Sequence, residues 1–296
     1  MTGGVIVLDK PGGITSFDAV RAVGRILREK KCGHAGTLDP TATGVLPICV
    51  GVATKIAGYL SDEDKEYEAA FSFGVATDTG DAAGKPVETV PGAVAEEREV
   101  AAALSELVGT FLQVPPSYSA VKVGGVRSYA LARKGKEVPL APRRVTVFES
   151  RLLSWDPGGF RAAVTCSKGF YIRALSRDLG DRLGVPMTVA SLRRLRVGDF
   201  RIEGAVTLDA LRELADAGAA GERVIPIVDA LSRMPAWVVP PDAVAAVRNG
   251  RLAGPWLAGM VAEGRGDTAL LVTAQREPLA IVGREPSGLW KILRGI

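Results

Sequence analysis

Histidine and cysteine are both scarce in this chain of 296 residues, which holds one His and three Cys. Cys32, Cys49 and Cys166 are scattered and odd in number, so they predict free thiols in a reducing compartment and no disulfide framework. With a single histidine and no CxxC pair, the chain also lacks the ligands that a zinc site needs. We therefore expect no metal site.

Motifs for triphosphate and dinucleotide chemistry are absent as well. The sequence holds no GxxxxGK[ST] loop, no GxGxxG fingerprint and no GxSxG nucleophile elbow. No apolar run approaches the roughly 20 residues that span a bilayer, and the first such run, VIVL, stops at Asp9-Lys10-Pro11. These absences predict a cytoplasmic protein with no nucleotide or other cofactor and no membrane partner.

Basic residues are concentrated in one part of the chain, although the formal net charge is only +4. Residues 121–201 contain 17 Lys and Arg against 6 Asp and Glu, so the remainder is net acidic. This asymmetry predicts a face that binds a polyanion such as nucleic acid. A solvated surface with unrelated basic residues is the alternative.

The pattern of apolar residues predicts an α+β fold. Strands are expected where these residues run together or alternate, at 4–8, 67–76, 144–155 and 160–166. Helices are expected where they recur at helical spacing, after residue 15, at 96–108 and at 172–183. Near Met234 short apolar runs begin to alternate with Gly-rich turns, which predicts one domain at 1–233 and a small, mainly β domain at 234–296.

The first predicted helix has the clearest boundary signal. Thr15 and Asp18 have the spacing of a capping box. We expect an inward face made of the apolar residues Phe17, Val20, Val23 and Leu27. The basic run 28–31 is expected to end the helix, where cations suit the helix dipole.

The loop that follows, GHAGTLDP at 33–40, contains the lone histidine and a lone carboxylate, Asp39. Pro40 favours an extended conformation at Asp39, and a rigid loop presenting one carboxylate suits catalysis. An Asx turn or a helix cap is the alternative. His34 could act as a general base or stack on a nucleobase.

Aromatic and basic residues occur together at 64–67, 115–138 and 167–173. Bases stack on aromatic rings, and phosphates pair with Lys and Arg. No recognition helix of the helix-turn-helix type is evident, so the pattern favours RNA over duplex DNA.

Seven motifs in order along residues 4–200 resemble the B family of bacterial tRNA pseudouridine synthases, which act at position 55 in the T loop of tRNA. They are GVIVLDKPGGITS, GHAGTLDPTATGVLPICVGVATK, DKEYEA, TDTGDAAG, VPPSYSAVKVGGVRSYALARKG, SKGFYIRALSRDLG and SLRRLRVGDF. The last sixty or so residues loosely resemble a small RNA-binding domain of the PUA type. The resemblance implies a catalytic domain with a central antiparallel sheet, flanking helices and an RNA cleft.

The resemblance also implies roles for individual residues. Asp39 would be the essential catalytic residue and Arg173 would pair with it. The residues expected to contact the flipped uridine are His34, Tyr67, Tyr171 and Leu192, and those expected near the cleft are Lys10 and Lys55. Most family members have a small residue where Phe170 stands, which leaves the packing beside Tyr171 open.

The implied reaction breaks the N1–C1′ bond of uridine, turns the uracil and joins C5 to C1′. Asp39 could attack the ribose, attack the base or remove a ribose proton, and the sequence leaves these routes open. We hypothesise that Arg173 keeps Asp39 ionised in a site shielded from water, that Tyr67 stacks on the extruded uracil and that His34 fills space the base has left. The cluster of Arg193, Arg194 and Arg196 is expected to contact phosphates, with a solvated face as the alternative.

Two other functions stay open at this point. A noncatalytic RNA-binding or tRNA-folding factor would use the same basic face without needing Asp39. A hydrolase using Asp39 as a base on a small substrate would leave the basic segment unexplained. The favoured prediction is a monomer that modifies the T stem-loop of tRNA without a cofactor.

Overall fold

A computed structural model of the chain describes residues 3–119, 122–123, 126–128, 140–257, 259 and 267–296. Its framework is a nine-stranded sheet in the order β1-β3-β12-β4-β11-β10-β7, with β2 beside β3 and β13 beside β12. The strands are β1 (Gly4–Lys10), β2 (Cys32–His34), β3 (Thr43–Val50), β4 (Lys65–Phe73), β7 (Gly109–Gln113), β10 (Arg143–Asp156), β11 (Gly159–Cys166), β12 (Met187–Val197) and β13 (Phe200–Arg201). Two-stranded sheets pair β5 (Val75–Thr77) with β6 (Pro86–Thr89) and β8 (Lys122–Val123) with β9 (Val126–Arg127).

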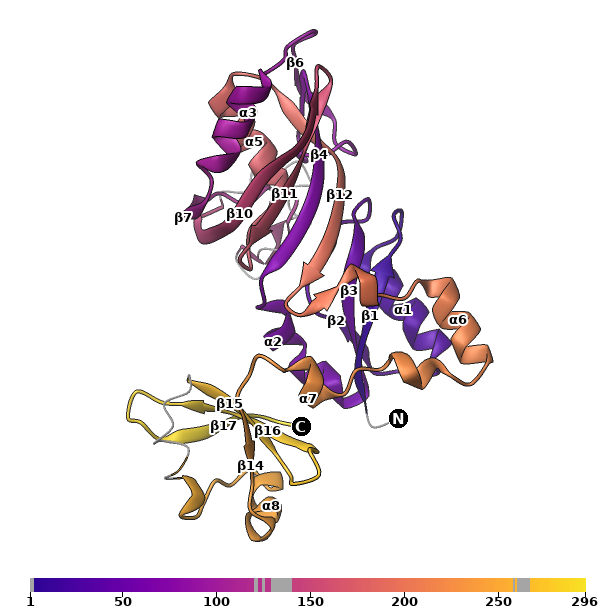
Figure 1. Ribbon diagram of the computed structural model, residues 1–296, viewed down its shortest axis with the longest axis vertical. Helices are drawn as coiled ribbons and strands as arrows, with labels where there is room; N and C mark the ends of the chain where they lie inside the picture. Colours follow the sequence, from indigo (N-terminus) through magenta and orange to yellow (C-terminus); the bar gives the residue numbers. More distant parts are fainter. Residues whose placement is uncertain (1–2, 120–121, 124–125, 129–139, 258, 260–266) are drawn as a thin grey trace.

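The helices cover the sheet in two groups (Figure 1). In one half, α3 (Glu97–Ser105) and α5 (Ile172–Leu183) pack on β4, β10, β11 and β12 around a buried apolar cluster. In the other half, α1 (Ser16–Ile26) and α6 (Leu208–Asp216) pack on β1 and β3. The remaining short helices are η1 (Gly51–Ile56), α2 (Ala57–Ser61), η2 (Ile202–Gly204), η3 (Ala220–Arg223) and α7 (Ile227–Ala230). The predicted α+β fold with a central sheet and flanking helices is confirmed.

The two halves of the sheet meet at a short parallel contact. All other neighbours in the nine-stranded sheet are antiparallel, but β12 runs parallel to β3, with Arg193 opposite Thr43 and Arg194 opposite Gly44. Gly44 has a φ of +101°, and a Cβ atom there would lie 2.1 Å from the carbonyl oxygen of Arg194. Only glycine therefore allows β3 to approach β12 this closely.

The capping box predicted for α1 is present. Thr15 Oγ1 accepts a hydrogen bond from the Asp18 backbone N (3.0 Å), and Asp18 Oδ2 accepts one from the Thr15 backbone N (3.3 Å). Two other expectations for this helix are wrong. Phe17 is 60% exposed, since Ser16 takes the buried position at this end of the helix. The helix ends at Ile26, and Arg28 follows with a φ of +54°, so the basic run lies beyond the helix.

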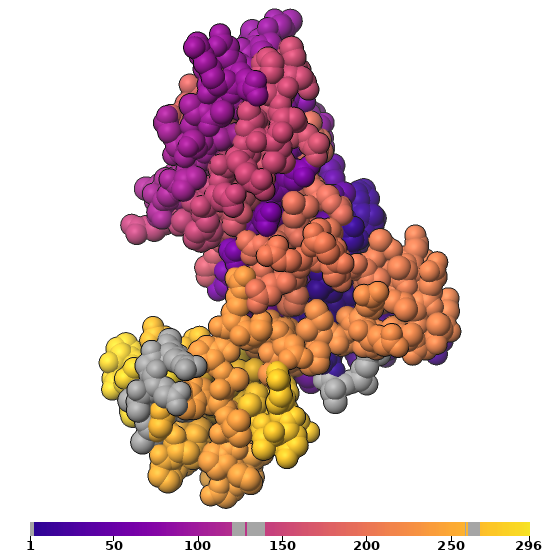
Figure 2. All heavy atoms as spheres, viewed as in Figure 1, coloured from indigo at the N-terminus to yellow at the C-terminus, as the bar shows by residue number. Residues whose placement is uncertain are grey.

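The C-terminal part forms a separate four-stranded sheet, in the order β14-β15-β16-β17, with α8 (Pro241–Arg248) packed against it. Its strands are β14 (Ala236–Val238), β15 (Thr268–Val272), β16 (Pro278–Arg284) and β17 (Trp290–Gly295). The mainly β character predicted for this part is confirmed. Figures 1 and 2 show it beneath the half of the molecule that contains β1 and β3.

Apolar and ionic contacts join this second sheet to the main body. Leu270, Val272 and Ile281 belong to a buried cluster that also contains residues of β1 and β3. Arg276, in the turn between β15 and β16, pairs with Asp229 of α7 (2.8 Å). Among the described residues, none of the helices combines the length and the apolar character needed to cross a membrane.

Gly44→Ala tests the contact between β3 and β12. The new methyl group would meet the Arg194 backbone, and alanine is strained at a φ of +101°, so we expect a loss of at least about 2 kcal/mol in the free energy of unfolding. Gly58→Ala is the matched control, because Gly58 lies in α2 with nothing within 4 Å of the added Cβ. Urea unfolding measures both. Equal stability of the two variants would contradict the close approach.

Candidate active site

The loop that carries Asp39 connects β2 to β3 and is held on both sides of that residue. Ser16 Oγ donates to the Leu38 carbonyl (2.9 Å) and accepts from the Leu38 N–H (2.8 Å). The Pro40 carbonyl accepts from the Gly13 N–H (2.8 Å) and from Lys10 Nζ (3.3 Å). Since the backbone is fixed at 38 and 40, the position of the Asp39 side chain is restricted to a few rotamers.

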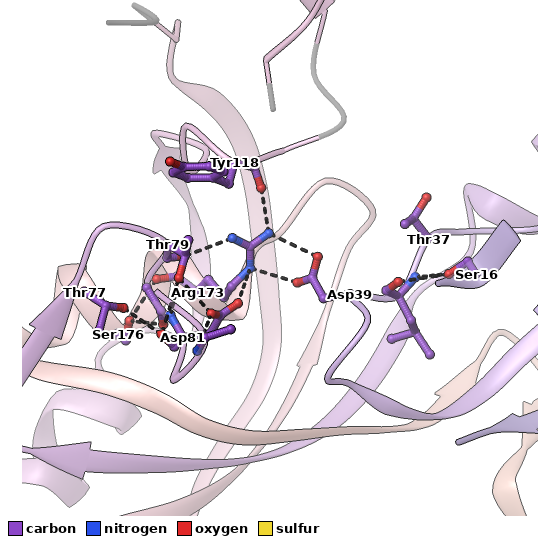
Figure 3. Close-up of polar contacts among 12 residues, drawn as sticks. Ser16, Thr37, Asp39, Thr77, Thr79, Asp81, Tyr118, Arg173 and Ser176 are labelled. Carbon is purple, nitrogen blue, oxygen red and sulfur yellow. Dashed lines mark hydrogen bonds and ion pairs between the residues drawn. The ribbon is translucent and has the colours of Figure 1, made fainter. Parts of the chain in front are cut away.

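Arg173, in the first turn of α5, reaches across to Asp39 from the other half of the sheet. Its Nε donates to Asp39 Oδ2 (2.8 Å) and its Nη2 to Asp39 Oδ1 (3.2 Å), a two-point contact between the planar groups (Figure 3). Nη1 donates to the Thr79 carbonyl (2.9 Å) and Nη2 to the Tyr118 carbonyl (2.8 Å). The ion pair expected from the resemblance is therefore present, and the backbone fixes the guanidinium on its other edges.

Asp81 is a second carboxylate at this arginine. Its Oδ2 lies 3.6 Å from Arg173 Nε, and its Oδ1 accepts from Thr79 Oγ1 (2.7 Å) and from the Ala83 N–H (3.1 Å). Sequence reasoning did not assign Asp81 to the site, because acidic residues in a turn are most often solvated. The signal was the motif TDTGDAAG, which supplies both the carboxylate and the carbonyl that hold Arg173.

Asp39, Asp81 and Arg173 line a cavity of about 220 Å³. The other lining residues are Thr41, Ala42, Ala82, Ala83, Val189, Ala190, Ser191 and Leu192. The cavity lies between the Asp39 loop, the loop after β5 and the wall formed by β12. The Asp39 side chain is 35% exposed, so the expectation of a site shielded from water is wrong for this structure. The exposed part of the carboxylate can be reached by a ligand.

Lys10 lies under this loop and not in the lining of the cavity. It is fully buried, and its Nζ donates to the carbonyls of Pro11 (2.7 Å), Ile14 (2.9 Å) and Pro40 (3.3 Å). Burial lowers the pKa of Lys10 from 10.5 to about 8; Asp39 acts in the opposite direction, and Arg194 adds to the lowering. Lys10 thus holds the loop from below, whereas direct contact with RNA is blocked by its burial.

Two tyrosines expected at the site lie near Asp39. Tyr67, on β4, is half-buried. Burial raises the pKa of its hydroxyl, the positive charge of Arg194 lowers it, and the negative charge of Asp39 raises it. Tyr171 precedes α5, and its backbone is held by Gln113 (2.9 Å and 3.3 Å). Burial also raises the pKa of Tyr171, with a smaller contribution of the same sign from Asp39.

Of the other residues expected at the site, one lies at the cavity and two do not line it. Leu192 lines the cavity beside Asp39. His34 is half-buried at the end of β2, opposite Ile48, and is not among the residues that line the cavity. Lys55 lies in η1, beyond the end of β3 that is remote from the Asp39 loop. Phe170 is buried and packs edge to face against Phe111, which settles the packing beside Tyr171.

The expectation that three arginines near the end of β12 contact phosphates is wrong for two of them. Arg194 is 1% exposed and donates to backbone carbonyls, while Arg196 is 9% exposed and pairs with Asp64 (2.6 Å) and Glu66 (3.3 Å). Arg193 is partly exposed and pairs with Asp9 (2.8 Å). In a strand that is covered on one face, alternate side chains point inward whatever their charge.

Carboxylates from elsewhere in the chain neutralise much of the basic segment. In the described part of 121–201, the ion pairs with carboxylates outside the segment are Arg161–Glu68, Lys168–Asp62, Arg173–Asp39, Arg173–Asp81, Arg182–Glu106, Arg193–Asp9, Arg196–Asp64 and Arg196–Glu66. The basic face is therefore smaller than the charge count suggests. Most of the stretch 115–138, predicted to contact RNA, lies outside the described residues.

Comparison with known proteins identifies the family of this chain. The family model described as "TruB family pseudouridylate synthase (N terminal domain)" matches residues 24–172, and "tRNA pseudouridylate synthase B C-terminal domain" matches 173–234. A protein of Chromohalobacter salexigens named tRNA pseudouridine synthase B is 44% identical over 260 residues, which is 88% of this chain and 84% of the relative. A Bacillus subtilis protein of the same name is 41% identical over 258 residues, covering 85% and 84%.

Solved structures share the fold over almost the whole chain. A chain of a Cbf5-Nop10-Gar1 complex is 27% identical, with a TM-score of 0.74 over 99% of this chain and 83% of that chain. A chain of an H/ACA RNP bound to a substrate RNA containing 2'-deoxyuridine is 26% identical, with a TM-score of 0.70 over 99% and 83%. The fold and the aspartate–arginine site thus define a pseudouridylate synthase. Within that class, the chain belongs to the TruB family.

Lys10→Met tests the buried lysine under the loop. The pKa of Lys10 is lowered from 10.5 to about 8 in the folded protein. Between about pH 8 and pH 10.5, the Lys10 amine is therefore mostly protonated in the unfolded chain and mostly neutral in the folded protein. Because the unfolded chain binds more protons in this pH range, the free energy of unfolding rises with pH. From about pH 7.5 to about pH 10, it should increase by about 1–3 kcal/mol more for the wild type than for Lys10→Met. Urea unfolding of both proteins at about pH 7.5 and about pH 10 measures the difference. A difference that does not change with pH would contradict this assignment.

Proposed function

We propose that this protein converts uridine to pseudouridine in tRNA, at position 55 in the T loop, with Asp39 as the catalytic residue. The observation that carries the proposal is the pairing of Asp39 with Arg173 in an open cavity whose wall, β12, includes Leu192. The family relatives named tRNA pseudouridine synthase B support the same activity.

The proposed reaction is an isomerisation within one nucleotide. The N1–C1′ bond breaks, a C5–C1′ bond forms, the proton on C5 is lost and N1 gains one, so no co-substrate is consumed. Asp39 would act as a nucleophile on the ribose or the base, or as a base towards a ribose proton. All three routes use the Asp39 carboxylate, and the two-point contact with Arg173 orients it.

The reacting uridine has to leave its stack before Asp39 can reach it, which costs a few kcal/mol. Tyr67 is proposed to stack on the uracil, with Leu192 against the base from β12 and Tyr171 beside the ribose end of the cavity. His34 is proposed to fill the space that the base leaves, without moving protons.

Further parts of the proposal concern the surroundings of the site. Residues 234–296 would form a PUA-like RNA-binding domain, continuous with the catalytic domain at 1–233. The protein would act as a monomer in the cytoplasm, and the T stem-loop would be its minimal substrate. A noncatalytic RNA-binding factor is the alternative function, but it gives no role to the buried arginine that holds Asp39.

Asp39→Asn separates catalysis from binding. The amide cannot act as nucleophile or base, so we expect pseudouridine formation in a T stem-loop RNA to fall by more than about 10³-fold. RNA binding should change by less than about threefold. Asp62→Asn is the control, because Asp62 is an exposed carboxylate remote from the cavity. Product from Asp39→Asn at the rate of the control would refute the proposal, and binding without product in the wild type would favour the alternative.

His34→Phe distinguishes the two roles of the lone histidine. Phenylalanine keeps a flat ring but has no proton to transfer, so we expect most of the activity to remain in single-turnover assays. A general acid or base contributes about 10²–10⁴-fold to a rate. A loss of that size with RNA binding intact would show that His34 transfers a proton.

A further inference from the structure

Arg194 is a buried arginine without a carboxylate partner among the described residues. It is 1% exposed, although its neighbours on β12, Arg193 and Arg196, both pair with carboxylates. A buried charge is unfavourable unless hydrogen bonds compensate for the lost hydration. The hydrogen-bond acceptors of Arg194 therefore show which part of the structure this side chain stabilises.

Those groups are carbonyls on both sides of Asp39. Arg194 Nη2 donates to the Gly36 carbonyl (3.1 Å) and Nη1 to the Thr37 carbonyl (3.3 Å), in the arm of the loop before Asp39. Nε donates to the Val45 carbonyl (2.7 Å), in β3, which follows the loop. One guanidinium thus bridges the two ends of the loop that presents Asp39.

The local backbone fits this arrangement. Gly36 has a φ of +97°, a conformation that glycine adopts without strain and that orients its carbonyl towards Arg194. Gly44 lets the backbone of β3 come against that of Arg194. Two glycines of the motif 33–51 therefore serve the contact between this arginine and the loop.

Arg194 also belongs to the strand that forms the wall of the cavity. Val189, Ser191 and Leu192 of β12 line the cavity opposite Asp39. Burial raises the pKa of the hydroxyl of Tyr67, the ring proposed to stack on the uracil, and the positive charge of Arg194 lowers it, so the two side chains lie close together. The same residue is therefore connected to the wall, to the proposed stacking ring and to the loop with the carboxylate.

We propose that Arg194 is a positioning residue for the reaction, which sets the place of the Asp39 carboxylate relative to a base held against β12 and Tyr67. This inference rests on the proposed function of the site. It does not require Arg194 to touch RNA, which its burial prevents. Displacing a catalytic group by about 1 Å can reduce a rate by about 100-fold.

Arg196 provides a matched control two residues further along β12. It is also a buried arginine, but its partners are Asp64, Glu66 and the Gly198 carbonyl, none of which belongs to the Asp39 loop. An Arg→Lys exchange at either position keeps the charge and loses the planar fork of donors. Loss of stability alone should affect both variants alike.

The experiment compares Arg194→Lys, Arg194→Gln and Arg196→Lys with the wild type. Single-turnover rates on a T stem-loop RNA, the dissociation constant for the same RNA and thermal unfolding are measured for each protein. We expect the rate of Arg194→Lys to fall by about 10-fold and that of Arg194→Gln by about 100-fold, with RNA affinity within about threefold of the wild type. The rate of Arg196→Lys should stay within about threefold of the wild type.

A rate loss confined to the Arg194 variants, partly restored by lysine relative to glutamine, would support the proposal. It would be overturned if folded Arg194→Lys and Arg194→Gln reacted at the wild-type rate, or if Arg196→Lys lost as much rate. Failure of both Arg194 variants to fold while Arg196→Lys folds would also overturn it, because Arg194 would then be required for the fold as a whole. If the wild type itself makes no pseudouridine, it is the proposed function that fails.

Discussion

The contact between Arg173 and Asp39 is the interaction on which the site depends, because it joins side chains from two halves of the sheet whose strands pair directly only over a short parallel stretch. Asp39 comes from the loop between β2 and β3, and Arg173 from the start of α5. Four of the polar contacts of the guanidinium reach groups from three separate loops. A side chain fixed in this way has little freedom, so the carboxylate is oriented before any ligand arrives.

Two buried cations also restrict the position of the Asp39 loop. Lys10 and Arg194 both hold the Asp39 loop through backbone carbonyls, and the positive charge of Arg194 contributes to lowering the pKa of Lys10. Carbonyl partners compensate the lost hydration of these cations without adding a competing carboxylate beneath the loop. The carboxylates that pair with Arg173 among the described residues are Asp39 and Asp81, and both approach its Nε.

Much of this could be predicted from the sequence, because local signals and one specific motif carried the information. The spacing of Thr15 and Asp18 predicts the capping box of α1, and the glycines and Pro40 indicate the loop with Asp39. The burial of Arg194 and Arg196 could not be predicted, since a run of arginines in a strand gives no sign of which side chains face the interior. Phe17 shows the reverse case: its hydrophobicity suggested burial, but Ser16 occupies the inward position because its hydroxyl bonds to the Asp39 loop.

These exceptions share a physical origin in the geometry of β12. The strand must pair with β4 along most of its length and also run parallel to β3 for two residues, so its side chains serve different neighbours at successive positions. Leu192 lines the cavity, Arg193 pairs with Asp9, and Arg194 lies under the Asp39 loop. A strand with three environments in three residues has no simple hydrophobic alternation, and long-range contacts decide where each charge goes. The geometry of the site is thus specified in part by residues that resemble, in the sequence, an ordinary basic surface.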